Sequence, residues 1–137
     1  MKASEALERL GGYASRAELI AAGCWPEMVD MGLYYRQILR VRRGHYASID
    51  TPLQVLKALR VGGRLACVSA VDYYEGHHRP ERPVHVLVPY GSSRLGSDPC
   101  GPAVIHWSRL QLEGSRTVVS ESIARSQAQR CAGGEQR

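Results

Sequence analysis

The segment from Arg36 to Ala47 constrains the fold more than any other part of the sequence. Apolar and basic residues alternate along it, with Leu39 and Val41 on one side and Arg40 on the other, and Gly44 can close a tight turn with positive φ. We therefore predict a β-hairpin here. Its surface would be strongly basic, because the segment contains Arg36, Arg40, Arg42 and Arg43.

Three short helices are predicted ahead of this hairpin. Apolar spacing over residues 4–10 predicts the first helix, which the glycine pair after it should end. Ser15 stands three residues before Glu18, and this spacing is typical of a capping box that opens a second helix. Pro26 suits the first turn of a third helix over residues 25–35, because its fixed φ is already helical.

The order of these elements predicts a winged helix-turn-helix over residues 1–50. The third helix would enter the major groove of DNA, and the hairpin would rest on the phosphate backbone. Val29, Gly32 and Leu33 share the face that would pack inward, and the opposite face would carry Glu27, Asp30, Met31, Tyr34 and Tyr35. Tyrosine and glutamate can contact base edges, but Glu27 and Asp30 repel phosphates unless they face bases or Arg36.

The rest of the chain is predicted to form a small α+β domain over residues 51–120, so the whole chain is expected to be α+β. Thr51 and Pro52 would open one helix, and a second is predicted over residues 67–74 with Val68, Ala70 and Val71 facing inward. A buried strand over 84–89 should pair with 103–107 in a short antiparallel sheet, with 117–119 as a candidate third strand. Residues 121–137 are expected to form a weakly helical basic tail.

The loop over residues 89–96 is a second candidate for contact with DNA. Two hydroxyls and a guanidinium on a flexible glycine backbone could cradle a phosphate, and these groups belong to Ser92, Ser93 and Arg94. Loops rich in serine and glycine are also common between strands that bind nothing, and the sequence leaves both interpretations open.

The charge of the chain favours an anionic partner without identifying one. The formal net charge is +5, carried by 18 basic and 13 acidic residues. Almost all basic residues are arginine, which suits phosphate and guanine contacts, but a GC-rich genome produces the same preference.

Motifs for catalysis or metal binding are not apparent in the sequence. Glu75, His77, His78, His85 and His106 invite a metal site, but their spacing matches no common one, and the four cysteines lie more than thirty residues apart. Neither a nucleophile elbow nor a phosphate-binding Gly-Lys-Ser motif is present. We therefore expect no metal, no cofactor and no enzymatic activity.

Four segments resemble, in order and spacing, the actinobacterial proteins that carry an AbiEi-type antitoxin N-terminal domain. They are residues 12–19, 39–47, 67–70 and 84–89, and the resemblance covers about residues 5 to 120. It implies a winged helix-turn-helix, DNA binding and transcriptional repression, in an antitoxin or in a phage immunity repressor. Relatives tend to be arginine-rich where this chain has Glu27, Met31, Tyr34 and Tyr35, so the resemblance does not imply an operator sequence.

The leading hypothesis is a sequence-specific, double-stranded-DNA-binding repressor in the cytoplasm. The polar start of the chain lacks the apolar run of a signal peptide, and no stretch is long and apolar enough for a membrane span. Two alternatives stay open: a protein-interaction module that binds a toxin or a second copy, and the DNA-attachment remnant of a larger endonuclease-like protein. The predicted DNA-binding residues are Ser15, Arg16, Pro26, Glu27, Asp30, Met31, Tyr34, Tyr35, Arg36, Arg40, Arg42, Arg43, Ser92, Ser93 and Arg94.

Overall fold

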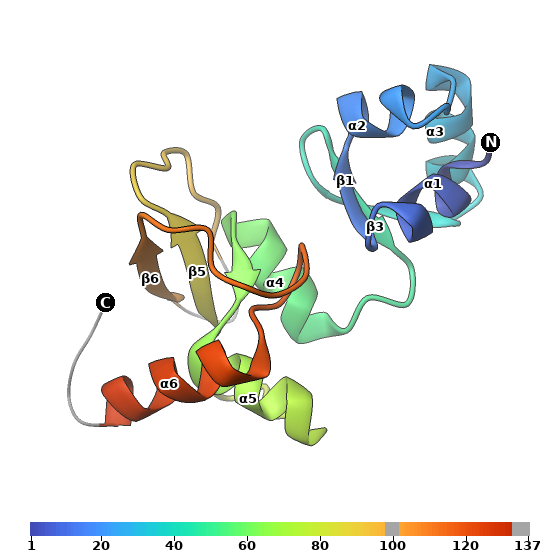
Figure 1. Ribbon diagram of the computed structural model, residues 1–137. Helices are drawn as coiled ribbons and strands as arrows, with labels where there is room; N and C mark the ends of the chain where they lie inside the picture. Colours follow the sequence, from blue (N-terminus) through green and yellow to red (C-terminus); the bar gives the residue numbers. More distant parts are fainter. Residues whose placement is uncertain (98–101, 133–137) are drawn as a thin grey trace. The chain divides into compact units, whose positions relative to one another are not determined.

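The computed structural model describes residues 1–97 and 102–132, and the chain divides into two compact units (Figure 1). Unit 1 comprises Met1–Pro52 and unit 2 comprises Leu53–Arg137. The described residues form six helices and two three-stranded sheets, so the predicted α+β class is confirmed. No helix in this part of the chain has the length and apolar character needed to cross a membrane.

Unit 1 packs three helices against a small antiparallel sheet. Its elements in chain order are α1 (Ala3–Arg9), β1 (Tyr13–Ser15), α2 (Arg16–Ala21), α3 (Pro26–Tyr34), β2 (Ile38–Arg42) and β3 (His45–Ser48). The strands are ordered β1-β3-β2, so the last strand lies between the other two. The helices and the sheet share one apolar core, whose fully or almost fully buried side chains include Leu7, Leu19, Val29, Ile38 and Tyr46.

The helix starts of unit 1 follow from local sequence. The Ser15 hydroxyl accepts the backbone N–H of Glu18 at 3.1 Å, and the Glu18 carboxylate accepts the N–H of Ser15 at 2.9 Å, which confirms the predicted capping box. Pro26 is the first residue of α3. Gly32 lies on the buried face of this helix, where a Cβ would come within 3.2 Å of the Ile38 side chain. The small residue therefore lets α3 approach β2 closely.

The β2–β3 hairpin forms as predicted, but its buried positions differ. Gly44 closes the turn with a φ of +74°, a conformation that glycine adopts without a steric penalty. The pairing register shifts between Arg40 and Arg42, which is a β-bulge. As a result Ile38 and Val41 are the buried residues of β2, whereas the regular alternation had placed Leu39 with Val41.

Unit 2 combines three helices with a mixed sheet. Its elements are α4 (Leu53–Val61), β4 (Arg64–Leu65), α5 (Cys67–Glu75), β5 (His85–Pro89), β6 (Val104–Ser108) and α6 (Glu121–Ala132). The strands are ordered β4-β5-β6, and β4 pairs with β5 antiparallel. Residues 117–119 form two isolated bridges instead of a full third strand, one between Val118 and Leu65 and one between Val119 and Gly114.

The pairing of β5 with β6 corrects the sequence-based expectation of an antiparallel sheet. The two strands are parallel, with His85 opposite Val104 and Leu87 opposite His106. A tight hairpin forces antiparallel pairing, but residues 90–103 are numerous enough to carry the chain back across the sheet. Segment 84–89 was thus matched to its correct partner, in the wrong direction.

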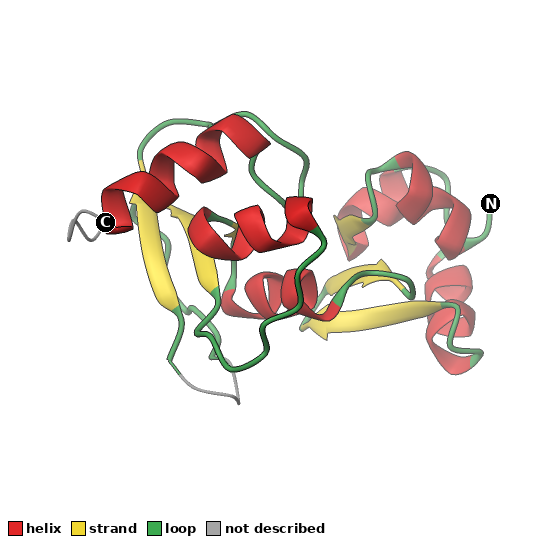
Figure 2. Cartoon of the chain, turned by 90° about the horizontal axis from the view of Figure 1, so that it is seen from below, coloured by secondary structure: helices red, strands yellow, loops and turns green. Residues whose placement is uncertain are grey.

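Helices α5 and α6 pack side by side (Figure 2). The segment that the sequence suggested as a basic tail therefore forms a helix packed within unit 2, with Ala124 and Gln127 buried. On α5 the buried residues are Cys67, Ser69, Ala70 and Asp72, whereas Val68 and Val71, predicted to face inward, are half-buried. Contact with both β5 and α6 explains this difference, because it turns another side of the helix inward.

Candidate functional site

The outward face of α3 carries every side chain that the sequence placed there. Glu27, Asp30, Met31, Tyr34 and Tyr35 are exposed, as is Pro26 at the helix start. Tyr34 is the most open of the large side chains on this helix, at 79% exposure. The opposite face, with Val29 and Gly32, is buried against the core, so the helix has one face free to meet a partner.

Asp30 forms an exposed ion pair with Arg16, which the sequence did not indicate as its partner. The Arg16 guanidinium lies 3.4 Å from the Asp30 carboxylate, whereas the expected counter-charge was Arg36. Contact with the Tyr46 hydroxyl, and then with Asp30, raises the pKa of Arg16 above its usual value. The pair joins the start of α2 to the middle of α3, and it removes part of the charge that would repel phosphate from this face.

The arginines of the hairpin separate into two kinds. Arg36, Arg40 and Arg43 are exposed, and none of their side chains forms an ion pair with any residue that the structure describes. Arg42 is half-buried near Tyr13, whose pKa is raised by burial and lowered in part by the Arg42 charge. Arg36 adopts a φ of +56°, which is uncommon for a residue other than glycine. The hairpin and the turn before it thus carry three exposed arginines, and Arg42 is half-buried.

The serine-glycine loop over residues 89–96 belongs to unit 2. Ser93 and Arg94 are exposed and Ser92 is half-buried. Two left-handed positions shape the loop, with φ of +87° at Gly91 and +57° at Arg94. The contact of Ser92, Ser93 and Arg94 with DNA stays a prediction.

Unit 2 also gathers four potential metal ligands that sequence reasoning did not connect. The ligand atoms of Cys67, His85, His106 and Cys131, hereafter the cysteine–histidine cluster, all lie within 4.8 Å of one another. The two sulfurs are 3.3 Å apart, His85 Nδ1 is 2.9 Å from His106 Nε2, and Cys131 Sγ is 4.0 Å from His106 Nε2. Each residue comes from a different element: α5, β5, β6 and α6.

Burial favours the uncharged forms of three members of the cluster, Cys67, His85 and His106. Burial, followed by the Cys131 hydrogen bond, raises the pKa of Cys67 to about 12, so this sulfur is held as a thiol. Burial, followed by His106 and Arg82, lowers the pKa of His85 to about 4, and burial and Arg130 lower that of His106. Neutral imidazole is the form that binds metal.

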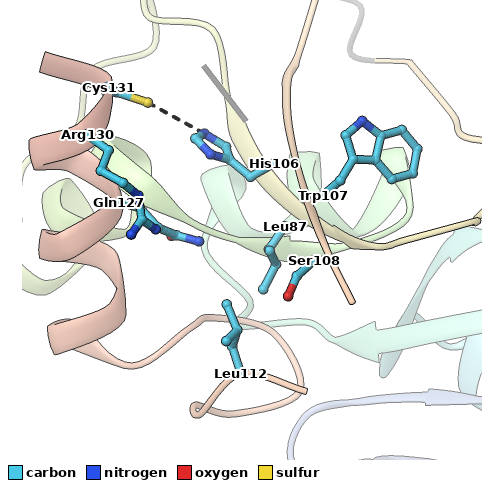
Figure 3. A pocket seen from close by; sticks show the side chains of 8 residues that line it. All are labelled: Leu87, His106, Trp107, Ser108, Leu112, Gln127, Arg130 and Cys131. Carbon is cyan, nitrogen blue, oxygen red and sulfur yellow. Dashed lines mark hydrogen bonds between the residues drawn. The ribbon is translucent and has the colours of Figure 1, made fainter. Parts of the chain in front are cut away.

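Two buried polar side chains fix the backbone of the cluster. The Gln127 side-chain oxygen accepts the N–H of Cys67 at 3.0 Å, and the Ser69 hydroxyl oxygen accepts the N–H of His85 at 2.9 Å. A hollow of about 310 Å³ lies alongside, and Figure 3 shows Cys131 and His106 pointing toward each other at its wall. Gln127, Arg130 and Cys131 all reach this hollow from one side of α6.

The other candidate metal ligands from the sequence have separate roles. Glu75 lies 3.6 Å from His77 and 3.2 Å from Arg125, on the surface of unit 2. Of the set considered in the sequence, only His85 and His106 join the cluster. The two cysteines were missed because no close Cys-x-x-Cys spacing marks them, and only the parallel pairing of β5 and β6 and the packing of α6 bring the four together.

Comparison of the chain with protein-family models and with curated proteins gives no match. The function proposed below therefore rests on the residues of each unit and their geometry.

Proposed function

We propose that unit 1 is a winged helix-turn-helix that binds double-stranded DNA, and that the protein acts as a sequence-specific transcriptional repressor. One observation carries this proposal. An exposed helix face with polar and aromatic side chains occurs in the same compact unit as three exposed arginines without ion-pair partners, of which Arg40 and Arg43 lie on the hairpin and Arg36 lies just before it. A helix of this kind can read base edges while a basic hairpin holds the backbone.

The order of elements in unit 1 supports the proposal. Three helices and three strands alternate as α1-β1-α2-α3-β2-β3, with sheet order β1-β3-β2. In a winged helix-turn-helix the second and third helices form the helix-turn-helix, and the last two strands form the wing. On this assignment α3 is the recognition helix and the turn at Gly44 is the tip of the wing.

The distribution of charge supports binding through the hairpin. Unit 1 has seven basic and six acidic residues, so its net charge is too small to attract DNA by itself. Residues 36–48 contain four arginines and no acidic residue, and this concentrates positive charge on one edge of the unit. Arginine also pairs with phosphate through two parallel hydrogen bonds, which fixes orientation as well as adding attraction.

The exposed face of α3 would supply sequence preference. The Glu27 carboxylate can accept a hydrogen bond from the amino group of cytosine, and the Tyr34 ring can contact a thymine methyl group. Because Asp30 is already paired with Arg16, the remaining acidic group near the start of the helix is Glu27. We expect this face to prefer sites that place a cytosine amino group opposite Glu27.

Selection from a pool of random duplexes tests the proposal directly. The full chain should enrich one short motif over repeated rounds, because α3 would make specific base contacts. Tyr34→Ala and Glu27→Ala should each weaken binding to that motif by about 1–3 kcal/mol per lost base contact, and should change which bases are enriched. A pool that stays random after selection with the wild-type chain would contradict sequence-specific binding.

A second candidate function is supported by the apolar part of the same face. Trp25, Met31, Tyr34 and Tyr35 are 69%, 51%, 79% and 62% exposed, which is unusual for large apolar side chains. Such a patch suits a protein partner, either a toxin or a second copy of this chain. Analytical ultracentrifugation of Tyr34→Ala and Tyr35→Ala variants separates the two functions, because only a self-association surface would make the wild-type mass exceed that of these variants.

A further inference from the structure

We propose that the cysteine–histidine cluster of unit 2 is a structural metal site that takes one zinc-class divalent ion through Cys67, His85, His106 and Cys131. This site is independent of the proposed DNA-binding surface, since all four ligands belong to unit 2.

The donor set matches the preference of zinc. Two sulfurs and two imidazole nitrogens form the Cys₂His₂ combination that zinc binds in structural sites, whereas magnesium and calcium prefer oxygen ligands. Four protein ligands also fill a tetrahedral shell, so no position is left for a substrate. These properties indicate a structural ion and not a catalytic one.

The spacing between the two sulfurs, and that between the two nitrogens, is close to that of a filled site. Zinc bonds of about 2.3 Å to sulfur and 2.0 Å to nitrogen place the two sulfurs about 3.8 Å apart and the two nitrogens about 3.3 Å apart in a tetrahedron. The sulfurs are 3.3 Å apart and the nitrogens 2.9 Å apart. Each pair therefore needs to open by only about half an ångström, which side-chain rotation can supply.

The backbone at two of the four ligands, Cys67 and His85, is held in place. Cys67 has a φ of +55°, which costs free energy for any residue with a side chain, and such strain is concentrated at functional positions. Two buried side chains, Gln127 and Ser69, hold the N–H groups of Cys67 and His85. They act as positioning residues, because they orient ligands without touching the ion.

Charge and access also suit a divalent ion. Binding replaces the two thiol protons by the ion, so two protons are released to solvent and the Zn²⁺ charge is balanced by two thiolates. The hollow at the wall formed by His106 and Cys131 gives an ion a route from solvent (Figure 3).

A disulfide between Cys67 and Cys131 is the competing use of the same atoms. It would require the sulfurs to close from 3.3 Å to about 2.05 Å and would need an oxidant to remove two electrons. It would leave the convergence of His85 and His106 on the same point without a role. The metal site uses all four side chains.

The test is the metal content of the full chain, purified under reducing conditions without added metal. We expect one equivalent of zinc by mass spectrometry of the digested protein. After removal of zinc, titration with Co²⁺ should produce the visible bands of a tetrahedral ion together with near-ultraviolet thiolate-to-cobalt absorption. Both signals should saturate at one equivalent.

Matched variants distinguish zinc binding at this site from non-specific zinc binding elsewhere on the chain. Cys131→Ser and His106→Gln should each abolish stoichiometric zinc binding. Cys24→Ser, a buried cysteine of unit 1, and His78→Gln, an exposed histidine of unit 2, should leave it unchanged. Wild-type protein without zinc and without the tetrahedral cobalt spectrum would overturn the proposal, as would recovery of Cys67 and Cys131 as a disulfide. Because the cobalt spectrum is read on the wild-type chain, a variant that fails to fold does not remove the test.

Discussion

At the level of single residues, two glycines are required for different reasons. Gly44 adopts a φ of +74° at the hairpin turn, and a Cβ there would meet open space. Gly63 lies outside the left-handed region, but a Cβ there would overlap the carbonyl oxygen of Leu87 on β5. Backbone conformation thus restricts the first position, and close packing restricts the second.

Substitutions at these glycines should separate the two causes. Gly63→Ala should lower the free energy of unfolding of unit 2 by about 1–3 kcal/mol, because β4 and β5 must separate to admit the methyl group. Gly44→Asn should cost less than about 1 kcal/mol, since asparagine tolerates positive φ and has room here. Amide hydrogen exchange of each unit measures both effects. Equal protection in Gly63→Ala and wild type would contradict the packing account.

The predicted DNA-contact residues also differ in how they are held. Ser15, predicted to contact DNA, has its hydroxyl engaged in the cap of α2. Arg16 is held by Asp30, and Arg42 lies near Tyr13, whereas Arg36, Arg40 and Arg43 are open to solvent. Burial and pairing of this kind depend on residues distant in sequence, so residue type and spacing alone could not sort these arginines.

At the level of secondary-structure elements, helix α2 depends strongly on its N-terminal cap. It has six residues, too few to be stable in isolation, and its first turn is closed by the two hydrogen bonds between Ser15 and Glu18. The cap therefore fixes where helix α2 begins.

Ser15→Ala should lower the free energy of unfolding of unit 1 by about 1 kcal/mol, because the N–H of Glu18 loses its acceptor. The protection of the Leu19 and Val29 amides against hydrogen exchange reports this loss. Ser4→Ala is the matched control, since Ser4 lies within α1 and alanine favours a helix. A loss of protection as large in Ser4→Ala would show that the cap is not the cause.

Local signals explain which elements could be predicted from sequence. The capping box, the proline at the start of α3 and the turn at Gly44 each act within a few residues, and each was found in the structure as predicted. The bulge in β2 and the parallel pairing of β5 with β6 depend on contacts across the sheet, and the sequence-based predictions were wrong at both.

The whole molecule combines two units with different proposed roles. In our proposals, unit 1 would supply a DNA-binding surface, and unit 2 would supply a metal site that ties α6 to α5 and to the sheet. The cluster could not be derived from sequence, because its four ligands come from four elements and have no local motif. It exists only once the whole of unit 2 has folded.

The salt dependence of DNA binding tests the central proposal most directly. Dissociation constants of the full chain for its selected duplex should be measured over a series of salt concentrations. Each arginine–phosphate contact contributes about 0.9 to the slope of log K against log salt, so Arg40→Gln combined with Arg43→Gln should flatten the slope by about one to two units. Arg9→Gln, which removes a charge beside Glu5 and Glu8 on α1, should leave the slope unchanged. An unchanged slope in the double variant would contradict a DNA-binding wing.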